Sequence, residues 1–351
     1  MKRVEFFIVG NGLAGTMLAF EMLKNNIEFR IISSPEKSRA SEVAAGMINP
    51  LVFKRLTKSW MVDELLPVAK ERYQNLENLL GEQFYFEKKI LKPLSEQEKE
   101  LWLERKQNQA FNSYISLVDD FSPVKNVMQA AGYTQVSGSG YVALFSFLKF
   151  ADNFFKKQNL VVDATFNIQQ IKPEADYFEV DGVKASKVIF CEGAHIRHNP
   201  LFQWVKMVPV KGEVLLIHAP TLSEEFILNK KVFVLPVGNQ RFKVGSTYDW
   251  SDLSDIPTEQ GKLSITERLE NVITCDYKIE NQWAGVRPAT IDRRPVLGRH
   301  PGNRNLFVFN GLGTKGVMLA PYFAREMVSL ITSLNYEVIP EVRVERFNKI
   351  P

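Results

Sequence analysis

The chain starts with a short, nearly continuous apolar run from Val4 to Val9. Such a run is typical of a parallel strand that is buried on both faces. Glycine-rich residues follow it, and from Thr16 to Lys24 apolar side chains recur at helical spacing. The pattern therefore predicts a strand, a tight turn and a helix at the start of the chain.

A second unit of the same kind is predicted near the other end of the sequence. Asn305 to Phe309 reads as a buried strand, Asn310 to Gly316 as a glycine-rich turn, and Val317 to Ile331 as a helix. Because strands and helices alternate in this way, we expect an α/β fold. Three further apolar runs predict strands, at Glu28–Ser33, Val161–Val162 and Val188–Ala194.

Two central stretches have a different character. Residues from Glu82 to about Gln135 are polar and predict helices, with Ser95 to Glu98 resembling a helix start. Residues from Met207 to Trp250 alternate between apolar and polar side chains, as in Arg241–Thr247, which predicts an antiparallel sheet. We therefore expect a second domain whose segments alternate along the chain with those of the first.

Composition agrees with a two-domain globular protein. The 351 residues exceed the usual size of a single core, and 45% of them are hydrophobic and 24% charged. The 44 basic and 40 acidic residues are scattered, so the net charge of +4 does not indicate a nucleic-acid partner. No apolar run approaches the roughly 18 residues that span a bilayer. Because the first run reads as a strand rather than a signal, we expect a cytoplasmic protein.

Cysteine and histidine do not indicate a disulfide framework or a metal site. Cys191 and Cys275 lie far apart and outside any CxxC spacing, and the four histidines have no ligand spacing. We therefore expect no bound metal.

The turn after the first strand reads GNGLAG, residues 10–15, and each glycine has a physical role. The first permits the tight turn, the second lets the backbone approach a pyrophosphate, and the third lets the helix pack close to the strand. The helix N-terminus then presents free N–H groups and a positive dipole end to the phosphates. This context predicts a dinucleotide site, with a purely structural turn as the alternative.

The end of the second strand departs from this pattern. A carboxylate is expected there to bind the adenosine ribose hydroxyls, but the chain has Ser33. One serine hydroxyl cannot bind two hydroxyls as a carboxylate does. Either Ser33, Ser34 or Glu36 substitutes for the acid, or the adenosine is held less firmly.

Three further segments indicate which dinucleotide binds. Ala40 to Pro50 is rich in small residues that would let the chain pass close to a planar ring. Much later come GVRPATIDRRPVLG, residues 285–298, and NGLGTKGVMLAP, residues 310–321. Together with the first turn, and in this order, they resemble the D-amino-acid oxidase and glycine oxidase family of FAD-dependent amine oxidoreductases. The resemblance extends from Val4 to about Ile331. The same segments also resemble the oxidase domain of the bifunctional enzyme that modifies the tRNA wobble uridine.

This resemblance implies a Rossmann-like, glutathione-reductase-like FAD-binding domain and a discontinuous α+β substrate domain built on an antiparallel sheet. The expected FAD-binding domain comprises residues 1–80, 136–205 and 285–351, and the expected substrate domain residues 81–135 and 206–284. The FAD is expected to be non-covalent, because no cysteine lies in the segments where some relatives attach it. The second glycine turn is expected to face the flavin edge on which negative charge accumulates.

The resemblance and the glycine turns together assign the cofactor contacts. The expected residues are Gly10, Asn11, Gly12, Leu13, Ala14, Gly15, Ser33, Ser34, Ser41, Ala44, Ala45, Gly46, Met47, Val162, Cys191, Gly193, Gly311, Gly313, Thr314, Lys315 and Gly316.

Arg287 and Tyr248 are the expected catalytic-site residues. In relatives, the arginine of this segment pairs with the substrate carboxylate, and the planar guanidinium suits that task because it bonds both oxygens. The alternative is an arginine paired with Asp292 or another local acid. Tyr248 could close the pocket over the substrate, or it could be an amphipathic plug at a strand end. Lys211 is a weaker candidate.

The resemblance implies an enzyme that oxidises the C–N bond of a small carboxylated amine or amino acid, similar to glycine, sarcosine or a D-amino acid. The hydride would pass to flavin N5, and molecular oxygen is the expected electron acceptor. Two alternatives stay open. One is an oxidase acting on carboxymethylaminomethyl-uridine in tRNA, and the other is a flavin-binding protein without turnover.

Overall fold

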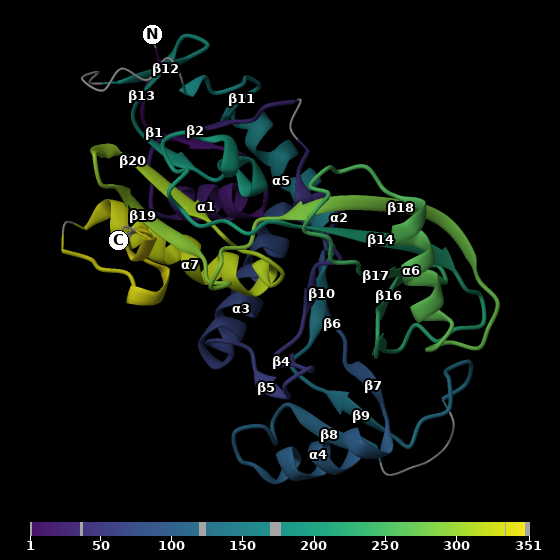
Figure 1. Ribbon diagram of the computed structural model, residues 1–351. Helices are drawn as coiled ribbons and strands as arrows, with labels where there is room; N and C mark the ends of the chain where they lie inside the picture. Colours follow the sequence, from purple (N-terminus) through teal and green to yellow (C-terminus); the bar gives the residue numbers. More distant parts are fainter. Residues whose placement is uncertain (1, 36–37, 119–123, 169–176, 334, 348–351) are drawn as a thin grey trace.

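The structure is a computed structural model that describes residues 2–35, 38–118, 124–168, 177–333 and 335–347. Within these residues, seven strands form a first sheet in the order β11-β2-β1-β13-β20-β19, with β12 paired to β13 (Figure 1). The four central pairings, from β11 to β20, are parallel, and β12 and β19 pair antiparallel. The strands are β1 (Lys2–Val9), β2 (Phe29–Ile32), β11 (Val161–Val162), β12 (Phe178–Val180), β13 (Val183–Phe190), β19 (Val296–His300) and β20 (Asn303–Asn310).

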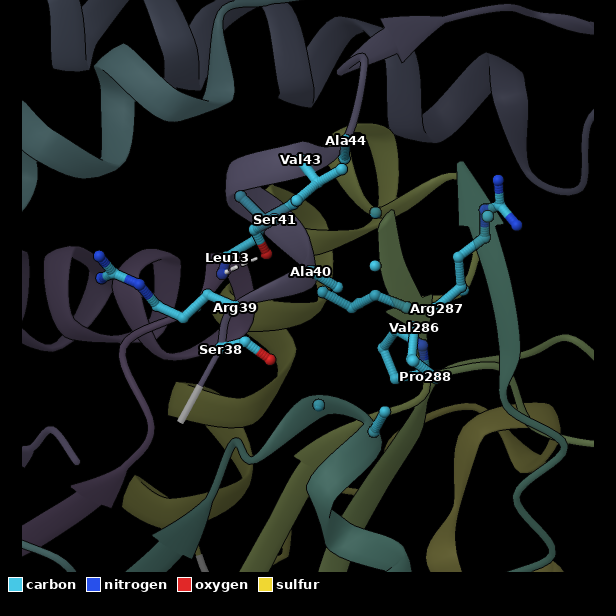
Figure 2. Close-up of a pocket in the computed structure, with 18 of the residues that line it drawn as sticks. Leu13, Ser38, Arg39, Ala40, Ser41, Val43, Ala44, Val286, Arg287 and Pro288 are labelled. Atoms are coloured by element: carbon cyan, nitrogen blue, oxygen red, sulfur yellow. Dashed lines mark hydrogen bonds between the residues drawn. The ribbon is translucent and has the colours of Figure 1, made fainter. Parts of the chain in front are cut away.

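The segment that follows β2 forms a very short helix beside the glycine turn. This helix, α2 (Ala40–Val43), is joined to α1 (Leu13–Lys24) because the Leu13 N–H donates to Ser41 Oγ at 3.2 Å (Figure 2). α2 also packs against strand β18 (Lys278–Arg287), which belongs to a second large sheet described below. The loop that follows the first strand–turn–helix unit therefore connects the two sheets.

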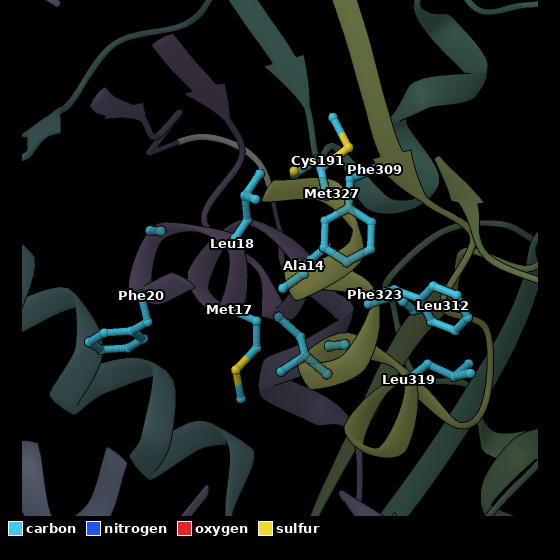
Figure 3. Packing of buried hydrophobic residues seen from close by; sticks show 14 of the residues in the cluster. Ala14, Met17, Leu18, Phe20, Cys191, Phe309, Leu312, Leu319, Phe323 and Met327 are labelled. Atoms are coloured by element: carbon cyan, nitrogen blue, oxygen red, sulfur yellow. The ribbon is translucent and has the colours of Figure 1, made fainter. Parts of the chain in front are cut away.

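Helices cover one face of the first sheet. Phe6 and Ile8 of β1 point into a cluster with α1 and with α7 (Gly316–Thr332), whereas Phe7 and Val9 point into a cluster on the opposite face. Figure 3 shows side chains of α1 and α7 meeting in the first cluster, with Phe309 of β20 beside them. Buried on both faces, β1 has the nearly continuous apolar sequence that such a strand requires. Two more helices pack against the same cluster, α3 (Val62–Leu80) and α5 (Leu144–Lys157).

A second sheet lies to the side of the first (Figure 1). In the described part of the chain it has eight strands in the order β18-β14-β17-β16-β15-β7-β9-β8, paired antiparallel except for β15 with β7. Helix α6 (Glu259–Leu269) packs on one part of it and α4 (Glu96–Gln107) on another. The strands are β7 (Ile90–Leu94), β8 (Ile115–Val118), β9 (Gly132–Val136), β14 (Val210–His218), β15 (Ile227–Asn229), β16 (Phe233–Gly238), β17 (Arg241–Gly245) and β18 (Lys278–Arg287).

Small elements complete the described fold. Two small sheets are formed by β3 (Met47–Ile48), β10 (Gly140–Val142) and β6 (Tyr85–Glu87), and by β4 (Leu51–Val52) and β5 (Thr57–Lys58). The short 3₁₀ helices are η2 (Gly193–His198), η3 (Pro340–Val342) and η4 (Val344–Phe347). None of the described helices is long and apolar enough to cross a membrane.

The mixed α/β fold is as predicted, but the prediction of helices across residues 82–135 was largely wrong. Its described residues form α4 and four strands, β6 to β9. Ser95 does begin α4, because the Glu98 N–H donates to Ser95 Oγ at 3.3 Å and the Ser95 N–H to Glu98 Oε2 at 3.0 Å. Strand β7 was missed because it is buried along its whole length but contains Lys92 and Pro93, so its sequence shows neither an alternation of apolar and polar side chains nor a continuous apolar run.

The two large sheets take their strands from alternating stretches of the chain. Residues 2–32, 161–190 and 296–310 supply the first sheet, and residues 90–136 and 210–287 supply the second. The division into an FAD-binding and a substrate domain follows the same alternation. That division remains a prediction.

We predict that Gly15→Ala destabilises the fold even in the absence of any ligand. A Cβ at Gly15 would lie 1.9 Å from the Gly10 carbonyl oxygen, so α1 would have to move away from the turn. The expected loss in the free energy of unfolding is about 3 kcal/mol, measured by urea denaturation of the apoprotein.

The matched control is Gly12→Ala in the same turn. Gly12 has φ −70°, and the nearest atom to its added Cβ is Ser41 Oγ at 3.6 Å, so its stability should change by less than about 1 kcal/mol. Equal losses in the two variants would contradict the packing role of Gly15.

Candidate functional site

A cavity of about 550 Å³ lies where the two large sheets meet. Val9, Ile32 and Cys191 line it from the carboxyl ends of parallel strands of the first sheet. Gly212 and Arg287 line it from β14 and β18 of the second sheet. Crevices outside the carboxyl ends of parallel strands are the usual ligand sites of such sheets.

The first glycine of the turn is fixed by backbone conformation. Gly10 has φ +103°, which side-chain-bearing residues rarely adopt, and a Cβ there would lie 2.6 Å from the Cys191 carbonyl oxygen. The turn therefore fits tightly against the end of β13. Gly12, by contrast, has open space toward the cavity, so its backbone is accessible to a ligand.

Two helix N-termini open into the same cavity. Gly12 is the N-cap of α1 and Lys315 that of α7, and neither end has a side-chain cap or an acidic residue in its first turn. Leu13 and Ala14 of α1 and Val317 of α7 line the cavity. Apart from the Leu13 N–H, which donates to Ser41 Oγ, the first N–H groups and the helix dipoles therefore favour a negatively charged ligand at both places.

Basic residues that the sequence analysis did not select also line this end. Arg39 Nη1 donates to Asp152 Oδ2 at 2.9 Å, and Asn11 Nδ2 donates to Asp152 Oδ1 at 3.1 Å. Arg197 Nη1 is buried and has no hydrogen-bond partner among the described residues. A buried donor without an acceptor is costly, so Arg197 fits a ligand that brings oxygen atoms. The concentration of His195, Arg197 and His198 directly after the buried strand β13 was the available signal.

The structure separates the candidates for the adenosine end. Ser34 lines the cavity, and its hydroxyl lies 2.9 Å from that of Thr165. Ser33 and Val162 are buried, and the Ser33 N–H donates to the Val162 carbonyl oxygen at 3.0 Å. Neither lines the cavity, whereas the neighbours of Val162, Ala164 and Phe166, do so. Glu36 lies outside the described residues.

Most of the expected cofactor contacts come together around the cavity, although their contact with FAD stays a prediction. Five of them do not line it, namely Gly15, Ser33, Val162, Gly311 and Lys315. Those that line it are Gly10, Asn11, Gly12, Leu13, Ala14, Ser34, Ser41, Ala44, Ala45, Gly46, Met47, Cys191, Gly193, Gly313, Thr314 and Gly316.

Lys315 turns its ammonium group away from the cavity. Its Nζ donates to the Asn49 carbonyl oxygen at 2.9 Å and to Ser59 Oγ at 2.6 Å. Burial without a carboxylate partner lowers the pKa of Lys315 to about 8. Lys315 therefore joins α7 to the segment that follows β3.

Arg287 carries the cation expected at the substrate end. Its Nη1 donates to the carbonyl oxygens of Lys211 at 3.3 Å and Thr247 at 3.2 Å, and its Nη2 donates to Ser246 Oγ at 2.7 Å. These acceptors are uncharged, and no described carboxylate forms an ion pair with Arg287. Desolvation on burial lowers the pKa of Arg287. The guanidinium is thus a partly buried charge that still lacks an anion.

The alternative pairing of Arg287 with Asp292 was wrong. Asp292 accepts from Arg346 Nε at 2.8 Å instead. Lys211, the weaker candidate for the substrate cation, is also engaged elsewhere, because its buried Nζ donates to Asp252 and, at 3.3 Å, to Ser254 Oγ. Asp292 and Lys211 do not line the cavity.

Arg287 is held in place by two neighbours of different kinds. The ring centroid of Tyr248 lies 4.6 Å from its guanidinium carbon, and the tyrosine is 55% exposed at the edge of the cavity. A Cβ at Gly212 would lie 1.9 Å from Arg287 Nη2, so the guanidinium occupies the space that a side chain at Gly212 would need. The sequence analysis missed Gly212, although a glycine inside a strand is a known sign of close approach.

The apolar wall between the two ends is formed by α2 and the end of β18. Figure 2 shows Ala40, Ser41 and Val43 across from Val286 and Pro288, with Arg287 reaching beyond them. In the part of the chain that the structure describes, no group of His, Cys, Asp and Glu side chains could hold a metal ion. The helix ends, the open backbone at Gly12 and the unpaired donor of Arg197 fit a dinucleotide phosphate at one end. The apolar wall and Arg287 line the other end.

Comparison with known proteins identifies relatives with this architecture. Glycine oxidase of Bacillus subtilis is 27% identical over 144 residues, which is 40% of this chain and 39% of that protein. The crystal structure of glycine oxidase from Geobacillus kaustophilus superposes with a TM-score of 0.81 at 20% identity, covering 97% of this chain and 98% of that one. Iminodiacetate oxidase from Chelativorans sp. BNC1 superposes with a TM-score of 0.82 at 18% identity, covering 98% of both chains.

The sequence matches to the glycine oxidases of Bacillus subtilis, Geobacillus kaustophilus and Bacillus licheniformis span between 32% and 39% of those proteins. The model of the FAD dependent oxidoreductase family, in contrast, matches residues 5–330. Because that match includes both glycine turns and nearly all of the described fold, the chain belongs to the DAO family of FAD-dependent oxidoreductases.

Proposed function

We propose that this oxidoreductase oxidises the C–N bond of a small carboxylated amine or amino acid. The observation that carries the proposal is Arg287, an unpaired guanidinium in the same cavity as the dinucleotide-binding turn. A substrate carboxylate would supply the missing anion, and the planar fork can bond both of its oxygens. Glycine oxidases, to which the chain is similar, are named for a substrate of this type.

The residues that would hold FAD lie at the end of the cavity into which the N-termini of α1 and α7 open. The backbone of Gly12 to Ala14 and the N-terminus of α7 would hold its negatively charged parts, with Arg197 as a further donor. When bound, FAD supplies the hydride acceptor for the substrate carbon next to nitrogen. Molecular oxygen is the proposed electron acceptor.

The chain's own residues would bind and orient the amine. Arg287 would bind the carboxylate, and its hydrogen bonds to the carbonyl oxygens of Lys211 and Thr247 hold the guanidinium in position. Tyr248 lies over the guanidinium at the cavity edge and restricts the access of water. The apolar side chains of Val43, Val286 and Pro288 line the approach and favour an uncharged amine over an ammonium ion.

We predict that the purified protein is yellow with non-covalent FAD. Acid precipitation should release all of the flavin into the supernatant, where its absorption spectrum and chromatographic mobility identify it. Flavin that stays with the precipitate would contradict non-covalent binding, and a nicotinamide dinucleotide in its place would contradict the cofactor.

We predict that Arg287→Met keeps the flavin spectrum but loses most of its reduction by carboxylated amines. Loss of one partner of a desolvated, hydrogen-bonded charge pair typically costs about 2–5 kcal/mol, roughly thirty- to several-thousand-fold in kcat/KM. Arg287→Lys should recover only part of this, because an ammonium group does not reproduce the fork. Anaerobic flavin bleaching by glycine, sarcosine and D-amino acids measures the effect.

The control for Arg287→Met is Arg299→Met, which removes an exposed arginine of β19 that does not line the cavity. It should keep the kcat/KM of the wild type. Wild-type kcat/KM in Arg287→Met would show that Arg287 is structural.

We predict that Gly212→Ala lowers activity although every donor group is retained. The added Cβ would displace the Arg287 guanidinium, so KM for the carboxylated amine should rise by about tenfold or more while flavin is still bound. Gly302→Ala, in a surface turn where the added Cβ meets only His300 at 3.4 Å, is the control. An unchanged KM in Gly212→Ala would show that the position of Arg287 does not depend on this glycine.

A further inference from the structure

A second arginine lines the substrate end of the cavity without an acidic partner. Arg268, on the last turn of α6, donates from Nη1 to the Ser246 carbonyl oxygen at 3.2 Å. Its Nε donates to the Ser264 carbonyl oxygen at 2.7 Å, and its Nη2 to Ser264 Oγ at 3.2 Å. All these acceptors are uncharged, and among the described residues no carboxylate lies within 4.0 Å of the Arg268 guanidinium nitrogens.

Ser246 brings the two guanidinium groups together. Arg287 reaches its hydroxyl from β18, and Arg268 reaches its carbonyl oxygen from α6. The ring of Tyr248 lies over the Arg287 guanidinium, with its centroid 4.6 Å from the guanidinium carbon. Two like charges in a partly buried site repel each other, and neither is neutralised by the protein. Each of the two uncompensated arginines could therefore bind one anionic group.

The nearby carboxylates do not compensate for these cations because other groups hold them. Glu213 accepts from Thr258 Oγ1 at 2.8 Å and from Gln282 Nε2 at 2.6 Å. Asp252 accepts from Lys211. Asp255 lines the cavity, but it is exposed and forms no ion pair with either arginine. These carboxylates therefore leave the positive charges of Arg268 and Arg287 in the cavity uncompensated.

We propose that the preferred substrate carries a second carboxylate, which Arg268 binds while Arg287 binds the first. This inference rests on the proposed function and names its substrate class, an amine with two carboxylate arms. A single short amino acid would leave Arg268 without an anion. Arg268 is then the residue that selects dicarboxylates over monocarboxylates.

The test separates binding from turnover by using ligands that cannot be oxidised at nitrogen. Thiodiacetate has two carboxylates on a thioether, and (methylthio)acetate has one. Isothermal titration calorimetry of the holoenzyme should show at least about tenfold tighter binding of thiodiacetate, because its second carboxylate gains charge-assisted hydrogen bonds from Arg268. In Arg268→Gln this ratio of affinities should fall to about threefold or less.

Two further variants keep the test interpretable. Arg268→Lys retains the charge without the fork and should give an intermediate ratio. Lys262→Gln removes one positive charge from the same helix, at a side chain that pairs with Glu259 and does not line the cavity, and should keep the wild-type ratio. Equal affinities of the wild type for the two ligands, or equal losses for both in Arg268→Gln, would overturn the proposal.

Turnover gives the second readout. The ratio of kcat/KM for iminodiacetate to that for sarcosine should exceed about ten in the wild type and fall at least about tenfold in Arg268→Gln. Thiodiacetate preference without flavin reduction by any amine would refute the proposed oxidase function but support the dicarboxylate site. Amine oxidation without any dicarboxylate preference would support the proposed oxidase function but refute the dicarboxylate site.

Discussion

The contact between backbone and backbone at the first turn is the constraint on which the rest of the structure depends. Gly10 lies against the end of β13, and Gly15 lies against Gly10, at distances that exclude a Cβ at either position. This contact sets α1 close to the parallel strands, and α7 then packs beside it on the same face of the sheet (Figure 3). Both helix N-termini therefore open at the carboxyl ends of the strands, where the positive ends of their dipoles favour an anion.

The cavity joins two kinds of positive environment. At the dinucleotide end the charge is partial, from helix ends, and is supplemented by the buried donor of Arg197. At the substrate end it is formal, from Arg287 and Arg268, which bond only to uncharged acceptors. Leaving such groups without anions costs stability, and this cost is what supports the proposed anion-binding role of the cavity. Small residues let α2 and β18 pack closely between the two ends, so that both sheets line the same cavity.

The sequence predicted the parallel strands of the first sheet, because they contain apolar runs and two of their turns require glycine, but it did not predict β12 and β19, which pair antiparallel. Both strand–turn–helix units formed where expected, with α7 at Gly316–Thr332. The second sheet was predicted only in part. Residues 210–245 alternate visibly, whereas β7 is buried along its whole length and lies beside the polar helix α4, so the range 82–135 read as helical. Local pattern predicts a strand whose buried residues are all apolar, and it fails at β7, where distant elements also bury the polar side chain of Lys92.

The sequence by itself determined the family and the FAD cofactor and selected Arg287 as the candidate substrate residue, because glycine turns and an arginine in a characteristic segment are local signals. Only the tertiary structure decided which charges stay unpaired. Asp292, close to Arg287 in sequence, pairs with Arg346, and Lys211 pairs with Asp252. The roles proposed for Arg268, Arg197 and Gly212 could be recognised only from the structure, because separate elements bring these residues together around the cavity. Whether a charge is neutralised depends on distances across the fold, and no one-dimensional pattern contains those distances.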